Sequence, residues 1–140
     1  VNCLGDVIDP ETGIRLAGPL DEEMREILST EEIMISSYAD EKNLFGGNTT
    51  IGAVATNAAL TKSEAAKIAS MAHNGYARAI RPAHTMYDGD TIFTLSIGDI
   101  EAEVSTVGIL AAKVVERAVV NAVKNASPLC GLTCHSNLKS

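Results

Sequence analysis

Apolar and polar positions divide the first third of the chain into short segments. Residues 1–9 have the apolar content of a strand, and a turn is expected at residues 10–13, where proline and glycine occur. Apolar side chains near helical spacing predict a helix over residues 21–36, which has acidic residues in its first turn. The pattern then stops, so residues 37–48, which include two adjacent glycines, are predicted to form a loop.

The middle of the chain changes character abruptly. Residues 49–59 are an uncharged run of small and β-branched side chains, which predicts a strand buried on both faces. Thr61 and Glu64 have the spacing of a capping box, so a helix is expected from there to about Ile80. Pro82 disfavours continuation of that helix. Its small side chains indicate that it lies closely on another layer, such as a sheet.

The last third repeats the strand and helix pattern. Apolar and polar residues alternate over residues 91–97, which predicts a strand. An apolar band over residues 104–126 predicts a long helix that ends before Pro128, and the polar tail to residue 140 is expected to be mobile. The expected order is therefore strand, helix, strand, helix, strand, helix. This order indicates an α/β or α+β fold in a single domain.

Composition narrows the classes of function. The chain has 140 residues, of which 46% are hydrophobic and 21% are charged, a balance typical of one soluble globular domain. Because 18 acidic residues face 11 basic ones, the net charge of −7 argues against a nucleic-acid partner and is compatible with neutral or cationic substrates. No apolar run approaches the roughly 18 residues that a membrane span needs, so no membrane partner is expected.

The cysteines and the start of the chain bear on its compartment. Three scattered cysteines do not form a disulfide framework, which favours a reducing compartment, by default the cytoplasm. No signal peptide is visible, and the chain begins with Val1 in what resembles a strand already under way. We therefore expect a fragment or a processed product.

The junction of a glycine-rich loop with an apolar strand, at Asn48 and Thr49, is the most informative stretch for chemistry. If the bond between these two residues were cut, Thr49 would carry a hydroxyl nucleophile and a free α-amine. The unperturbed pKa of such an amine is near 8, so it can serve as the general base for its own hydroxyl. From spacing alone, a plain junction of loop and strand remains the favoured interpretation.

Polar residues elsewhere could assist such a nucleophile. Asp88 and Asp90 flank a glycine at the start of a strand, where they could orient an amine, although a solvated turn explains the same pattern. Asn2 could donate its amide to an oxyanion or simply occupy a strand edge. His84 could be a proton shuttle or a substrate contact, whereas His73 is expected to be a packing residue.

A metal site and a cofactor are not predicted. Cys130, Cys134 and His135 offer three ligands within six residues, but a structural zinc needs four and no fourth partner is evident. These three residues therefore receive no assigned role. The acidic pair at Asp88 and Asp90 also lacks a histidine or cysteine at ligand spacing.

Three blocks in the right order and spacing carry a family resemblance. They span residues 47–58 (GNTTIGAVATNA), 71–80 (MAHNGYARAI) and 84–91 (HTMYDGDT). Together they resemble the DmpA-type peptidases, a group that includes L-aminopeptidase/D-esterases, β-aminopeptidases and nylon-oligomer hydrolases. The similarity extends from about Val1 to about Ala126.

The resemblance implies a precursor that cuts itself between Asn48 and Thr49. Residues 1–48 would be the C-terminal end of an α piece and residues 49–140 a β piece, both parts of one αββα sandwich. Thr49 would be the N-terminal nucleophile, Asn2 would help to bind the oxyanion, and Asp88 and Asp90 match an acidic pair beside the nucleophile. Most of the α piece has no counterpart here, so an upstream piece is an expected partner and this fragment alone is expected to be inactive.

The expected activity is that of a self-processing hydrolase. It would act on small peptides or amides with a free amino end, through an acyl-enzyme on Thr49, in a homo-oligomer. Two alternatives stay open: an acyltransferase of the ornithine acetyltransferase kind, which shares the fold and the self-cleavage, and a catalytically silent subunit that serves only in assembly.

Overall fold

The computed structural model describes residues 1–37 and 47–138, and within them the chain has a mixed α/β fold with three α-helices and two small sheets. The predicted fold class is confirmed at this level. The elements in chain order are β1 (Asp6–Ile8), β2 (Arg15–Ala17), α1 (Thr30–Ser36), β3 (Ile51–Ala58), α2 (Lys62–Ala79), β4 (Ile80–Arg81), β5 (Thr91–Ile100), α3 (Val104–Lys124) and the short 3-10 helix η1 (His135–Asn137).

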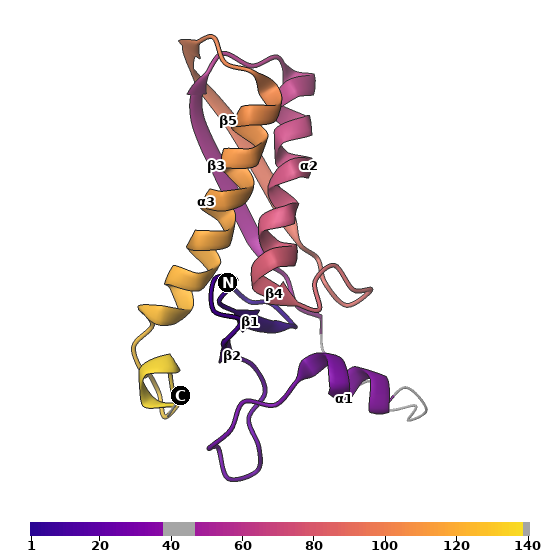
Figure 1. Ribbon diagram of the computed structural model, residues 1–140, viewed down its shortest axis with the longest axis vertical. Helices are drawn as coiled ribbons and strands as arrows, with labels where there is room; N and C mark the ends of the chain where they lie inside the picture. The colour runs from indigo at the N-terminus through magenta and orange to yellow at the C-terminus, as the bar shows by residue number, and fades with distance from the viewer. Residues whose placement is uncertain (38–46, 139–140) are drawn as a thin grey trace.

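Two long helices cover one face of a two-stranded sheet. Figure 1 shows α2 and α3 side by side along the ribbon of β3 and β5. The two helices approach closely at Gly75, where an added Cβ would lie 2.9 Å from the Cβ of Val115, closer than side chains tolerate. None of the helices in the described ranges is long and apolar enough to cross a membrane. The buried core between the layers includes Val54, Ile68, Ala72, Tyr76, Ile92, Ala111, Val115 and Val119.

The strands β3 and β5 run parallel, and this direction positions the candidate site. Their register pairs Ile51 with Thr91 and continues to Thr56 and Ser96. A parallel pair needs a crossover connection, which α2 supplies here. Because both strands start at the same end of the sheet, the residues just before Ile51 must lie beside those just before Thr91.

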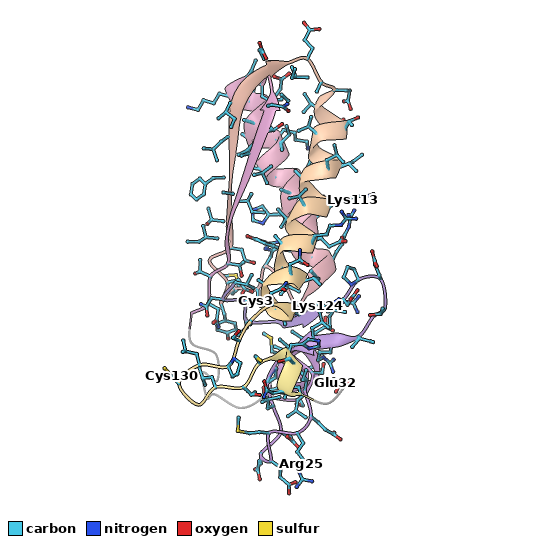
Figure 2. All side chains as sticks on the ribbon, turned by 90° about the vertical axis from the view of Figure 1, so that its left-hand side faces the viewer. Cys3, Arg25, Glu32, Lys113, Lys124 and Cys130 are labelled. Atoms are coloured by element: carbon cyan, nitrogen blue, oxygen red, sulfur yellow. The ribbon has the colours of Figure 1, made fainter. Side chains whose placement is uncertain are left out.

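The other face of this sheet is exposed, which corrects the expectation of a strand buried on both faces. Phe93 and Ile97 are 58% and 75% exposed, and Ile51 is 71% exposed. Figure 2 shows side chains that project from the sheet on the side away from the helices. Helices cover only one face, so the uncharged run of β3 has one buried and one open side among the described residues.

A second sheet lies near the end of the helices, below the starts of β3 and β5 in Figure 1. It has the order β2, β1, β4, and both pairings are antiparallel. Val7 and Ile80 lie opposite each other in this sheet and both belong to the core. Lys124, at the end of α3, contacts Asp9 with 2.6 Å between Nζ and Oδ2, which ties the long helix to the end of β1.

The helix predicted over residues 21–36 is wrong for its first part, because α1 begins only at Thr30. The carboxylate of Asp21 accepts the backbone N–H groups of Arg25 and Glu26, at 2.6 and 3.1 Å. Such side-chain bonds compete with the helical ladder, and Met24 has a φ of 55°, outside the helical region. Ser29 then caps α1 by accepting the N–H of Glu32 at 3.3 Å.

The other expected elements agree more closely. The capping box of Thr61 and Glu64 is present, the strand predicted over residues 91–97 extends to Ile100, and the long helix ends at Lys124. The opening strand is confined to β1, while β2 and β4 were not predicted. Most of the loop expected over residues 37–48 lies outside the described residues.

The C-terminal tail packs against the body of the chain up to residue 138. Cys134 is buried, and Nδ1 of His135 lies 3.1 Å from the backbone oxygen of Leu16 in β2. The tail therefore contacts the body of the chain at Cys134 and His135, while residues 125–133 are exposed, and its mobility stays a prediction.

Asp6 is the charged centre of the small sheet, and its removal should be costly. It is 1% exposed, lies 2.9 Å from Nε of Arg15, and accepts both the N–H and the hydroxyl of Thr30. Replacing Asp6 by asparagine leaves the arginine without its charge partner, so we expect a loss of about 3 kcal/mol in the free energy of unfolding of the full-length protein. Urea unfolding measures this loss. The exposed Asp99→Asn is the control, and equal stability of the two variants would contradict the account.

Candidate active site

The parallel strands bring the loop before β5 against the Asn48–Thr49 junction. Asn48 and Asp88 form an isolated parallel bridge just ahead of the sheet. The N–H of Asn48 donates to the oxygen of Tyr87 at 3.0 Å, and the N–H of Gly89 donates to the oxygen of Asn48 at 2.8 Å. The carbonyl before Thr49 is therefore held and polarised by a backbone donor.

The hydroxyl of Thr49 donates to the same carbonyl oxygen, that of Asn48. Its Oγ1 is 2.7 Å from the oxygen of Asn48, and the residue is exposed. Gly89 packs directly on this hydroxyl, because a Cβ added there would lie 2.6 Å from Oγ1. The hydroxyl is thus confined between the carbonyl of the preceding residue and the backbone of the Asp-Gly-Asp turn.

Asn2 lies next to Thr49 through its backbone. Its carbonyl oxygen accepts the N–H of Thr49 at 3.1 Å, and the residue is exposed. The structure therefore brings Asn2 to the junction, with its carbonyl on the nitrogen that would become an amine if the bond were cut. Asn2 also lines an open cavity of about 500 Å³, whose other walls include Cys3, Val123, Leu129, Leu132, Cys134 and His135.

The two carboxylates have separate structural partners. Oδ2 of Asp88 accepts the N–H and the hydroxyl of Thr85, at 2.8 and 2.7 Å, which stabilises the turn that carries Gly89. The side chain of Asp90 is only 4% exposed. Its Oδ1 accepts the N–H of Thr50 at 2.9 Å, and its Oδ2 lies 3.1 Å from Nδ1 of His84. Asp90 therefore contacts the backbone one residue after the nucleophile.

The rings of His73, Tyr76 and His84 form a cluster next to the carboxylate of Asp90. The ring of His73 lies 4.9 Å from that of His84 and 5.6 Å from that of Tyr76, both in edge-on arrangements. Burial lowers the pKa of His73, and the nearby His84 acts in the same direction. Burial also raises the pKa of Tyr76 to about 12, with a contribution from the charge of Asp90. Both groups are therefore uncharged at neutral pH.

The thiol of Cys3 belongs to the same neighbourhood but is suppressed as a nucleophile. Burial raises its pKa to about 11, and the charges of Asp90 and Asp88 act in the same direction. Figure 2 shows Cys3 near the foot of the sheet and Cys130 on the C-terminal tail. Within residues 1–37 and 47–138, no three histidine, cysteine or acidic side chains gather to hold a metal ion.

The structure thus brings together the five residues that the sequence assigned to the cleavage site: Asn2, Asn48, Thr49, Asp88 and Asp90. Sequence reasoning missed Gly89, whose N–H and missing side chain shape the site, and Thr85, which holds Asp88. Both residues lie in the sequence Thr-Met-Tyr-Asp-Gly-Asp, but this sequence does not predict that the N–H of Gly89 donates to Asn48.

The sequence pattern of peptidase family S58 matches residues 13–136, which include the junction, the acidic turn and both long helices. The chain belongs to peptidase family S58. This is a family of hydrolases, and the resemblance to DmpA-type peptidases is thereby confirmed.

Similar proteins fall into two groups by name. Uncharacterized aminopeptidases of Mycobacterium bovis and Mycobacterium leprae are 35% and 36% identical, with 99% of this chain covered in each case. A 6-aminohexanoate-oligomer endohydrolase of Kocuria sp. is 32% identical over 56% of this chain and 26% of its own length. The chain spans about half the length of the mycobacterial relatives, 46% and 42%.

Proposed function

We propose that these residues carry the self-cleavage junction and the nucleophile of an S58 hydrolase. The observation that supports this most directly is the placement of the Asn48 carbonyl between the hydroxyl of Thr49, at 2.7 Å, and the N–H of Gly89, at 2.8 Å. A backbone donor on the carbonyl oxygen is the group that stabilises the oxyanion in acyl transfer, and the hydroxyl that would attack the carbonyl carbon lies beside it.

The proposed self-cleavage proceeds in two steps. Oγ1 of Thr49 forms a bond to the carbonyl carbon of Asn48, its proton passes to solvent, and the N–H of Gly89 stabilises the oxyanion. The peptide C–N bond then breaks and the nitrogen of Thr49 takes a proton, which leaves an ester between the two residues. Water hydrolyses this ester, so that Asn48 ends in a carboxylate and Thr49 begins a new chain.

The same nucleophile is proposed to act on external substrates. The freed amine of Thr49, hydrogen-bonded to the carbonyl of Asn2, takes the hydroxyl proton as Oγ1 attacks, and then passes it to the leaving amine. Water hydrolyses the resulting acyl-enzyme. The amide of Asn2 is predicted to bind the oxyanion, and Asp88 and Asp90 to orient the amine.

The substrate class proposed is small peptides or amides with a free amino end. Two observations support it: the net charge of −7, which suits a substrate with an ammonium group, and the names of the aminopeptidase and 6-aminohexanoate-oligomer relatives. The open cavity beside Asn2 has the volume of a small-molecule site.

The chain spans about half the length of its mycobacterial relatives, and we propose that the other half of such a protein completes an αββα sandwich. The open face of β3 and β5, with exposed Phe93, Leu95 and Ile97, suits burial by a second sheet. An upstream piece of this protein would supply that sheet, and the complete unit is expected to form homo-oligomers.

Product analysis on the full-length, self-cleaved protein tests the reaction class. Short peptides and 6-aminohexanoate oligomers are supplied first in buffer and then with ornithine as an amine acceptor. We expect hydrolysis products in buffer alone, and their loss in Thr49→Ala. Products that form only with the acceptor would instead identify an acyltransferase, and a cleaved protein that turns over none of these compounds would favour an assembly subunit.

A further inference from the structure

His84 has a backbone conformation that its side chain does not favour. It lies in the loop between β4 and β5, and its φ is 59°, in the left-handed region that costs most residues about 1 kcal/mol. Glycine and asparagine adopt this region most readily. The backbone conformation fixes where the imidazole lies, and the contacts of the ring show what it can hold.

The contact is with a buried carboxylate. Nδ1 of His84 lies 3.1 Å from Oδ2 of Asp90, which is 4% exposed, whereas the histidine side chain is 38% exposed. The ring of His73 packs edge-on against that of His84, 4.9 Å away. The imidazole is therefore fixed between a neutral ring from α2 and the carboxylate at the start of β5.

The carboxylate of Asp90 also contacts the backbone at the cleavage junction, so a restraint on its position acts there too. Oδ1 of Asp90 accepts the N–H of Thr50 at 2.9 Å, and Thr50 is 2% exposed. The chain of contacts runs from His84 through Asp90 to the peptide group that follows Thr49. An error of about 1 Å in such a group can cost a hundredfold in rate.

We propose that His84 is a positioning residue for self-cleavage, acting through Asp90 on the backbone of Thr50. The pairing of Nδ1 of His84 with Oδ2 of Asp90, 3.1 Å apart, keeps the carboxylate on the Thr50 amide, which keeps Oγ1 of Thr49 directed at the Asn48 carbonyl. This inference rests on the proposed function, because it assigns a role within self-cleavage.

Two matched substitutions separate the donor from the backbone conformation. The substitution His84→Asn places an amide nitrogen near the position of Nδ1, whereas His84→Gly removes the donor, and both new side chains tolerate a φ of about 60°. In the full-length protein, we expect His84→Gly to slow self-cleavage at least tenfold and His84→Asn to stay within about threefold of wild type. Intact mass against time gives the rates.

A second readout reports the contact without any cleavage. In uncut Thr49→Ala protein, hydrogen exchange of the Thr50 amide is measured by NMR, with His84→Gly and His84→Asn added in turn. We expect faster exchange for His84→Gly and no change for His84→Asn. Wild-type self-cleavage in His84→Gly, or equal slowing by both substitutions, would overturn the role of His84, whereas an uncut wild-type protein would instead overturn the proposed function.

Discussion

Thr49→Ala is expected to abolish cleavage of the bond between residues 48 and 49. The hydroxyl of Thr49 lies 2.7 Å from the oxygen of the carbonyl that the reaction attacks, and alanine removes the attacking atom. Loss of a nucleophile typically costs several powers of ten in rate, so we expect at least a thousandfold decrease in the full-length protein. Intact mass after timed incubation near neutral pH measures it.

Thr49→Ser is the matched control for this experiment. Serine keeps Oγ and its proton, so self-cleavage should persist, slowed by about ten- to a hundredfold because one methyl group that positions the nucleophile is lost, and still well above the rate of the alanine variant. An alanine variant that is cut as fast as the serine variant would show that another group attacks this bond.

Gly89→Ala is expected to have the second largest effect, because the space beside the nucleophile is filled. The added Cβ would lie 2.6 Å from Oγ1 of Thr49, a distance that real Cβ atoms do not adopt. The hydroxyl must therefore move away from the carbonyl of Asn48. We expect self-cleavage to slow by about a hundredfold, as displacements of about 1 Å do in other active sites.

Gly47→Ala provides the comparison for this substitution. Gly47 lies one residue before Asn48, and a Cβ added there meets nothing within 4 Å. Both substitutions restrict the unfolded chain similarly, but only Gly89→Ala adds a group against Thr49, so Gly47→Ala should cleave at a rate close to wild type. Equal cleavage rates for the two variants would mean that Gly89 does not confine the hydroxyl.

The features that the sequence predicted well depend on local or repeated patterns. The capping box of Thr61 and Glu64 involves neighbouring residues, and the alternation over residues 91–97 identified a strand, although its apolar series at Phe93, Leu95 and Ile97 lies on the open face. The position of Asp88 and Asp90 near Thr49 followed from a family resemblance, and the parallel register of β3 and β5 gives its physical reason.

The features that were missed depend on contacts across the fold. The apolar spacing over residues 21–36 resembles a helix, but the carboxylate of Asp21 satisfies two N–H groups locally and keeps its first part irregular. Exposure of one face of β3 depends on how many layers the chain supplies, which its uncharged sequence does not reveal. Likewise, the polarising donor at Gly89 is a backbone group, and every residue except proline has one.

The central claim is that Thr49 becomes the first residue of a new chain, and the N-terminal sequence of the purified full-length protein tests it most directly. The account predicts two chains, one of which begins with Thr49, Thr50 and Ile51 and disappears in Thr49→Ala. A single uncut chain, or a second chain that begins at any other residue, would contradict it.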